Sequence, residues 1–430
     1  MSTTTGMFNE PESAPQGVKK FYLLDYFLIL LQSCLVSDNP EKIFQRFKTL
    51  KEKERLGESK YKKLVIDEGE DLSAKQVARY KYTLQQVINE SVACGLILDK
   101  NGLITLTKKG RRFLVFAENG KRMFYNNLLK ILEKQYSAFY HLVKLCYRQN
   151  QNKNGLLIFP IYSPRKLGFD KKEMKTNGHL IEYSNQLRRT LENDIHKFLD
   201  LKISLKAPET ELIAKLIDDK ILSSENSDDI FDSKQYNSII SRFRKFWLNY
   251  FLKSIYKYPF SFTTFNIWVE RGKQLGVVHT TEFYPNFDGR LVYPTSIIVE
   301  VNKNSDLVKA YDYSNGEYLF IHEPKWSNNK NKFIEALHNA YYDLKNSKRS
   351  NFIRISDLRE KVCYKLKLPS FKFNEFLQET YNESLKGETK IQISLEADRL
   401  PQETNAMYLK REPVIINKQQ KNIIAIDYKK

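Results

Sequence analysis

The chain has 430 residues, of which 41% are hydrophobic and 13% aromatic, which supplies packed cores and excludes a globally disordered chain. A chain of this length allows roughly two to four domains. The formal net charge of +19 favours a polyanionic partner, and nucleic acid ahead of a membrane surface. A/T-rich coding could raise the lysine content, but it would not by itself leave so few acidic residues beside the basic ones.

The first apolar run, FYLLDYFLILLQSCLV at 21–36, follows a polar tail at 1–18 that we expect to be disordered. The run is too short for a membrane span and contains Asp25 and Gln32, so we predict a buried core helix, no secretory signal and no membrane partner.

The cysteines form no CxxC pair and lie in apolar helical contexts. We therefore predict buried free thiols in a reducing cytosol, at Cys34, Cys94, Cys146 and Cys363.

A helix, a hairpin and a basic cluster follow one another over 73–114. Ser73 is a suitable N-cap for a helix whose apolar residues recur at helical spacing and which ends at Gly95. Asn101-Gly102 lies between LILD and LITLT, and this dipeptide favours a hairpin because both residues tolerate positive φ. A cluster without acids follows directly, formed by Lys108, Lys109, Arg111 and Arg112.

Two later segments repeat this order of elements, after a mainly helical stretch at about 120–205. At 260–294 we expect a helix that breaks near Gly276, then two strands around the turn Asp288-Gly289. At 353–428 we expect a helix capped by Ser356, a second helix that ends at Gly387, and two alternating strands. The long loop 398–413 between those strands has the length of a large wing.

This order of elements resembles the winged helix-turn-helix superfamily, best at 73–114 and less closely at 260–294 and 353–428. The resemblance implies a recognition helix in the major groove and a wing on the backbone or minor groove. It implies DNA contacts in the first copy at Lys81, Gln85, Gln86, Asn89, Lys100, Lys108, Lys109, Arg111 and Arg112. It implies contacts in the second copy at Asn266, Arg271, Lys273, Gln274 and Arg290. In the third copy it implies contacts at Lys372, Asn374, Gln378, Arg399, Lys410, Arg411, Lys418 and Lys421.

We therefore predict a mainly α protein with small antiparallel β-hairpins (α+β), in which several winged helix-turn-helix domains surround a central helical region. The predicted divisions are a tail at 1–18, a winged-helix domain at 19–118, a helical region at 119–205, a winged-helix-like domain at 206–325 and a winged-helix domain at 326–430.

The predicted function is non-catalytic DNA binding in the cytoplasm, without a cofactor and on duplex more than single-stranded DNA. Several winged helices in a basic chain resemble accessory subunits of larger complexes for DNA processing or phage defence. The fold is also a common protein-interaction module, so a scaffold for a helicase or chromosome-organising complex is an alternative.

A third alternative is a magnesium-dependent nuclease with a degenerate site. Asp288 followed by Glu300, Asn302 and Lys303 resembles an Asp and Glu-x-Lys arrangement, in which two carboxylates hold the metal. Asn302 occupies the lysine position, and Lys303 would point to the opposite face of a strand. Asp288 is equally explained as a turn residue. The chain has no P-loop or HExxH motif, and its six histidines lack metal-ligand spacing, so we predict no catalytic or metal site.

Overall fold

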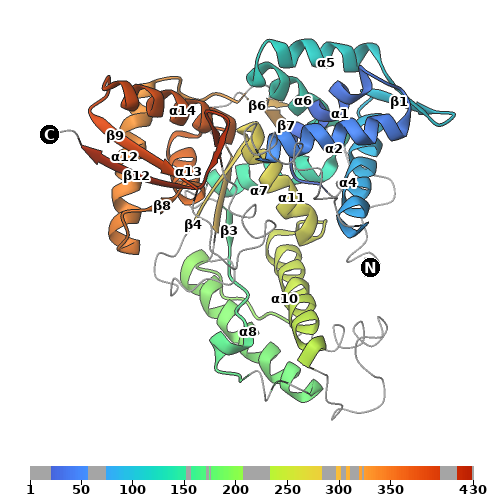
Figure 1. Cartoon of the computed structure of the whole chain (residues 1–430). Coiled ribbons are helices and arrows are strands. Elements are labelled where there is room, and N and C mark those ends of the chain that lie inside the picture. The colour runs from blue at the N-terminus through green and yellow to red at the C-terminus, as the bar shows by residue number, and fades with distance from the viewer. Residues whose placement is uncertain are drawn as a thin grey trace. The chain divides into compact units, whose positions relative to one another are not determined.

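The computed structural model describes residues 21–56, 74–151, 156–170, 174, 176–206, 233–282, 297–301, 307–309, 319–321, 324–397 and 414–428. Over these residues the chain is mainly helical with small antiparallel sheets, which confirms the predicted α+β class (Figure 1). Its packing separates two compact units among them: a larger one formed by 21–144, 267–281 and 300–428, and a smaller one formed by 145–266 and 297–299. The five divisions predicted from the sequence stay a prediction.

The larger unit begins with helices that enclose an apolar core. These are α1 (Asp25–Cys34), α2 (Pro40–Leu56) and α4 (Ala74–Ala93), followed by the hairpin β1 (Ile97–Lys100) and β2 (Leu103–Leu106), α5 (Lys108–Glu118) and α6 (Lys121–Gln135). Helix α1 packs against α2, α4 and α5 and buries Phe27, Leu30 and Leu31. The apolar run at 21–36 thus contains a buried core helix, as predicted, but the helix covers only 25–34, and parts of the run on either side of it are exposed.

The hairpin predicted at Asn101-Gly102 is confirmed. Strands β1 and β2 pair antiparallel from Ile97 opposite Leu106 to Lys100 opposite Leu103. Asn101 and Gly102 form the turn with φ of 52° and 74°, the positive values for which this dipeptide is suited.

The last part of the larger unit is a three-stranded antiparallel sheet covered by helices. The helices are α12 (Lys330–Lys348), α13 (Ile355–Leu366) and α14 (Ser370–Lys386). The sheet consists of β8 (Ile353–Arg354), β9 (Ile391–Glu396) and β12 (Ile423–Tyr428), and β10 (Val414–Ile416) and β11 (Gln419–Lys421) form a separate pair. Strand β12 lies between β8 and β9 (Figure 1). A continuous apolar core joins this sheet to its helices through Leu337, Leu358, Phe373, Phe376 and Ile424.

The larger unit also includes a short pair of strands, β6 (Leu307–Lys309) and β7 (Leu319–Ile321), and most of α11 (Phe262–Leu275) and β4 (Val278–Glu282). Trp268 of α11 is fully buried and stacks on Phe139, with ring centroids 4.6 Å apart. Phe139 belongs to α7 (Ser137–Gln151). Trp268 of α11 therefore serves core packing.

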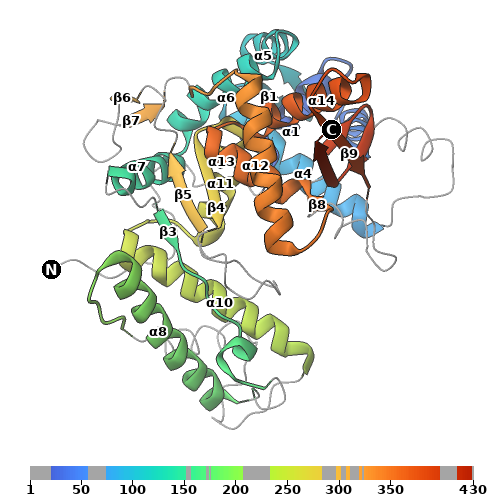
Figure 2. The ribbon, with the colours of Figure 1, turned by 90° about the vertical axis from the view of Figure 1, so that its left-hand side faces the viewer.

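The smaller unit contains two long helices that lie side by side, α8 (Asn177–Leu199) and α10 (Ser233–Tyr256) (Figures 1 and 2). The rings of Tyr183 and Phe243 join them at 5.3 Å. Arg244 of α10 is buried, and its Nε donates to the carbonyl oxygen of Ile161 at 2.8 Å. Strand β3 (Leu156–Ile158) pairs antiparallel with β5 (Ile297–Val301), ahead of the short helix η1 (Pro164–Leu167). The stretch at about 120–205, predicted as mainly helical, therefore also holds a strand and a turn of 3₁₀ helix.

All four cysteines are buried and free, as predicted. Among the helices that the structure describes, none combines the length and the apolar character that crossing a membrane requires.

Candidate nucleic-acid interface

Helix α4 has one apolar face and one polar face. Tyr80, Leu84 and Val87 are buried in the core, at the spacing of a helix whose one side meets the interior. The opposite face exposes Lys81 and Gln85 to solvent, as the sequence predicts. Lys81 also lies 5.4 Å from the ring centroid of Phe44, and Gln85 donates to Asn89 at 2.9 Å. Polar and basic groups therefore stand on the side of α4 that a partner could reach.

Two further exposed residues of α4 were not predicted from the sequence. Tyr82 lies near the centre of the outer face and is 51% exposed, although an aromatic residue in an apolar helix suggests the core. Its position in the sequence, out of phase with the buried residues Tyr80, Leu84 and Val87, could have placed it on the exposed face. Arg79 is exposed at the edge of the same face. Both add to the surface that the helix presents.

The one acid of α4 is buried and neutralised. Glu90 receives two hydrogen bonds from the guanidinium of Arg271, at 2.7 and 2.9 Å, and both side chains are fully buried. Arg271 also donates to the carbonyl oxygen of Phe21 at 3.2 and 3.0 Å. The described exposed charges of α4 are therefore all positive.

The prediction that Arg271 contacts nucleic acid is corrected by the same pair. Its guanidinium has no exposed surface, and Glu90 and the Phe21 backbone use its donors. Sequence spacing could not reveal a partner that lies 181 positions away.

The hairpin β1–β2 also has two faces. Ile97 and Ile104 are buried, and the amide of Ile104 donates to the carbonyl of Asp38 at 3.0 Å, which fixes the hairpin to the α1–α2 connection. The alternate residues are exposed, among them Lys100 at the tip and Leu98 and Leu103 beside it. The predicted wing lysine is thus free to reach a partner.

Helix α5 is pressed against the end of α4 at its first turn. The hydroxyl of Thr107 accepts from the amide of Gly110 at 2.9 Å, as an N-cap does. Thr107 also hydrogen-bonds to the carbonyls of Gly95 and Leu96. A Cβ at Gly110 would lie 2.1 Å from the Leu96 carbonyl oxygen, so only glycine permits this approach. The basic cluster is consequently held in a fixed position beside the hairpin.

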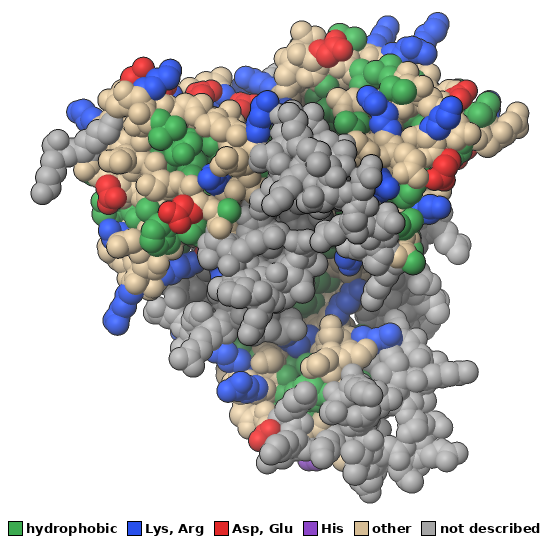
Figure 3. Space-filling view, in the orientation of Figure 1, with side chains coloured by type: hydrophobic (Ala, Val, Ile, Leu, Met, Phe, Trp, Pro, Cys, Tyr) green, Lys and Arg blue, Asp and Glu red, His purple; other side chains and the backbone are tan. Residues whose placement is uncertain are grey.

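Three of the four clustered basic residues point to solvent, namely Lys108, Arg111 and Arg112. Lys109 is exposed too, but its Nζ donates to the carbonyl of Cys94 at 2.8 Å and so caps α4. No Asp or Glu occurs between Lys100 and Glu118. Lys and Arg side chains project from this end of α5 in Figure 3.

The placement of this cluster is electrostatically unfavourable in the isolated chain. A helix N-terminus carries about half a positive charge, so each cation there is disfavoured by about 0.3–1 kcal/mol. The first turn of α5 has no acid to offset this. An incoming anion would meet both the side chains and the positive end of the helix.

The residues predicted in the later copies have other surroundings. Lys273 forms an ion pair with Glu270 at 3.3 Å on the wall of a cavity. Gln274 is bonded to the backbone of Leu24 and Tyr22, and Asn266 is half-buried. The ion pair of Lys273 and the hydrogen bonds of Gln274 are thus made with residues outside α4 and α5.

Helix α14 is the counterpart of α4 in the last copy, and it has a different character. Lys372 forms an ion pair with Glu375 at 3.1 Å and lies 4.3 Å from the ring of Phe376. Asn374 and Gln378 line the same cavity as Lys273. Lys418 is exposed at the β10–β11 turn, and Lys421 is half-buried on β11.

Several predicted residues lie outside the described part of the chain. These are Asp288, Arg290, Asn302, Lys303, Arg399, Lys410 and Arg411. Glu300 belongs to β5, and its side chain is not described. Within the described residues no three side chains of His, Cys, Asp or Glu gather in a way that could hold a metal ion.

No family model, curated protein or solved structure matches this chain.

Proposed function

We propose that the chain is a non-catalytic DNA-binding protein whose contact surface is formed by α4, the β1–β2 hairpin and the first turn of α5. The order of these elements, helices followed by a two-stranded wing, supports a winged-helix reading of this part of the chain. The observation that carries the proposal is the exposed basic cluster of Lys108, Arg111 and Arg112. The first turn of α5 contains no acidic residue, and the cluster lies at the positive end of the helix dipole.

Each part of this surface has a distinct role in the proposal. The cluster on α5 contacts phosphates, which supply most of the sequence-independent affinity. The exposed face of α4 enters the major groove, where Lys81 and Gln85 can reach base edges. Lys100 at the hairpin tip contacts the backbone or the minor groove. A cytoplasmic accessory subunit of a larger DNA-processing or phage-defence complex is the setting that we propose.

The test is a salt titration of duplex binding for the wild type and for a variant with Lys108→Gln, Arg111→Gln and Arg112→Gln. Each lost phosphate contact lowers the slope of log K against log salt by about one unit, so we expect a decrease of up to about three. Lys109 is retained because it caps α4. Circular dichroism checks that the fold persists.

A matched control removes three other exposed charges, by Lys332→Gln, Lys386→Gln and Lys390→Gln. This variant has the same net charge as the first but an intact α5 cluster. Equal slopes for the wild type and the α5 variant would contradict the proposal, and equal losses in both variants would reduce it to a general charge effect.

The C-terminal part of the larger unit supports a second candidate function, a protein-interaction module. Its helix α14 packs Phe371 against Tyr125, with ring centroids 5.3 Å apart, and against Trp326 at 6.0 Å. The face beside Phe371 carries Glu375 and Glu379. We therefore expect Lys372→Gln with Lys418→Gln to leave duplex binding unchanged, and a loss equal to that of the α5 variant would assign this domain to DNA instead.

A further inference from the structure

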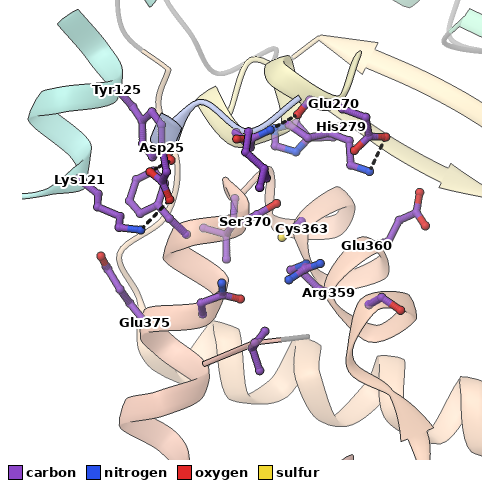
Figure 4. A pocket seen from close by; sticks show the side chains of 18 of the residues that line it. Asp25, Lys121, Tyr125, Glu270, His279, Arg359, Glu360, Cys363, Ser370 and Glu375 are labelled. Atoms are coloured by element: carbon purple, nitrogen blue, oxygen red, sulfur yellow. Dashed lines mark hydrogen bonds and ion pairs between the residues drawn. The ribbon is translucent and has the colours of Figure 1, made fainter. Parts of the chain in front are cut away.

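The larger unit contains a cavity of about 720 Å³, a size typical of sites for small organic molecules. Residues from α1, α2, α6, α11, β4, α13, α14 and β10 form its walls. Figure 4 shows their side chains converging on one space. The N-terminal helices, α11 and the C-terminal helices thus build this cavity together, and it is separate from the surface of α4 and α5 proposed for DNA.

The charges on the wall are matched. Five acidic side chains line the cavity with four basic ones: Asp25, Glu270, Asp357, Glu360 and Glu375 with Lys51, Lys121, Lys273 and Arg359. Lys121 pairs with Asp25 at 3.2 Å, and Tyr125 donates to the same carboxylate at 2.6 Å. Lys273 pairs with Glu270 at 3.3 Å. A ligand of high net charge, such as a polyphosphate, finds no excess of opposite charge here.

His279 on β4 is a buried hydrogen-bond acceptor. Burial, and then the charge of Lys367, lowers the pKa of its ring to about 3, so the imidazole is neutral at physiological pH. The ring hydrogen-bonds to the backbone of Gly276. Nε2 is buried and has no hydrogen-bond partner among the described residues. Since the neutral ring donates through its other nitrogen, Nε2 offers a lone pair at the cavity wall.

Asn374 on α14 contributes a second acceptor of the same kind. Its Oδ1 is buried and has no hydrogen-bond partner within the described part of the chain. Buried polar atoms in proteins are almost always paired, so two on one cavity wall need an explanation. A ligand that brings N–H donors would satisfy both.

Aromatic rings complete the wall. Tyr26, Tyr125 and Phe371 all line the cavity. Tyr125 and Phe371 lie with their ring planes at 31°, 5.3 Å apart. Such surfaces favour a flat ring, because stacked π-systems gain both apolar burial and a preferred geometry.

We propose that this cavity binds a nucleobase, presented either by a free nucleoside or by an unpaired nucleotide of a nucleic acid. A nucleobase is flat and uncharged, and its amino and ring N–H groups supply donors to Nε2 of His279 and Oδ1 of Asn374. Its carbonyl and ring nitrogens can accept from the donors of Gln378 and Ser370 on the same wall. Base recognition on protein surfaces elsewhere uses this combination of stacking and edge hydrogen bonds.

The experiment titrates adenosine, guanosine, cytidine and thymidine into the full chain by isothermal calorimetry, with melting temperature as a second readout. At least one nucleoside is expected to bind and to raise the melting temperature. Asn374→Leu and His279→Leu replace each acceptor by an apolar side chain and are expected to weaken that binding about tenfold or more. Asn382→Leu, on the same helix but outside the cavity, is expected to change it less than about twofold.

A competition experiment separates the two sources of the base. Displacement of the bound nucleoside by an oligonucleotide with one unpaired base, but not by the fully paired duplex, assigns the site to nucleic acid. Failure of both to displace it assigns the site to a free nucleoside.

The proposal is overturned if none of the four nucleosides binds, or if Asn374→Leu binds as the wild type does. Should His279→Leu fail to fold, Asn374→Leu alone decides, because α14 keeps its apolar core. The α5 variant with three charges removed is expected to bind the nucleoside normally, so the failure of this proposal is distinguishable from a failure of DNA binding.

Discussion

Helices α4 and α14 occupy equivalent places in the order of elements, but they present opposite surfaces. The charges that α4 exposes are basic, and its acid Glu90 is neutralised inside the core. Helix α14 carries Glu375 and Glu379 outward, and its Phe371 packs against Tyr125 and Trp326. The order of elements therefore does not determine which surface a helix presents. The surrounding packing and charge determine it.

The largest effect that we expect concerns the buried pair beneath α4. Arg271→Met leaves the carboxylate of Glu90 buried without its partner, and breaking such a pair costs about 3–5 kcal/mol of unfolding free energy. Urea denaturation measures the loss. The double variant Arg271→Met with Glu90→Leu should recover much of it, because an apolar pair can replace a buried ion pair. A double variant no more stable than the single one would show that the Phe21 contacts matter more.

The close approach of α5 to α4 provides the second test. Gly110→Ala places a Cβ 2.1 Å from the carbonyl oxygen of Leu96, so the helix must shift, at a cost of about 1–3 kcal/mol. Duplex affinity should fall as well, because the shift moves the basic cluster. Gly102→Ala serves as a control, since it meets no atom within 4 Å and suffers only from its φ of 74°. An equal loss in both variants would mean that packing at Gly110 is not special.

The cavity that α14 shares with β4 should make the stability of the fold depend on pH, through His279 of β4. Burial lowers the pKa of His279 in the folded state to about 3, from 6.5 in the unfolded state. Between these two pH values the unfolded state binds a proton that the folded state does not bind. Stability is therefore lost as pH falls from about 6.5 towards 3, by up to about 1.4 kcal/mol per pH unit. Denaturation at several pH values measures this slope, and His279→Gln should reduce it. An unchanged slope in the variant would assign the dependence to other groups.

The smallest effect concerns Lys372 on α14. Its ion pair with Glu375 joins a side chain that is 19% exposed to one that is 45% exposed, so Lys372→Gln should cost less than about 1 kcal/mol. It should leave duplex affinity unchanged, whereas Arg112→Gln should lower both the affinity and the salt slope, the slope by about one unit. Similar binding losses in the two single variants would remove the contrast between α14 and the α5 region.

Local signals were sufficient where local chemistry decides the structure. The Asn101-Gly102 turn, the core helix within the apolar run at 21–36 and the glycine end of α14 at Gly387 all follow from spacing and backbone preference. The basic residues of α5 were identified for the same reason, since a run without acids is visible in the sequence.

Long-range pairing was not accessible in this way. Arg271 resembles an exposed basic residue of a recognition helix, and only the fold reveals Glu90 beside it. The cavity could not be predicted either, because its walls come from eight elements spread over most of the chain. His279 and Asn374 become notable only once burial leaves their polar atoms without a partner in the described residues.

The burial of all four cysteines has a practical consequence for measuring DNA contact. Burial raises the pKa of the Cys34 and Cys363 thiols to about 12 and also raises the pKa of Cys94, so these thiols are protonated and poorly nucleophilic at neutral pH. A single cysteine introduced at the exposed Thr105 of the hairpin should then be the preferred site for a maleimide dye without removal of any native thiol. The chain therefore allows site-specific fluorescent labelling and crosslinking at the β1–β2 hairpin.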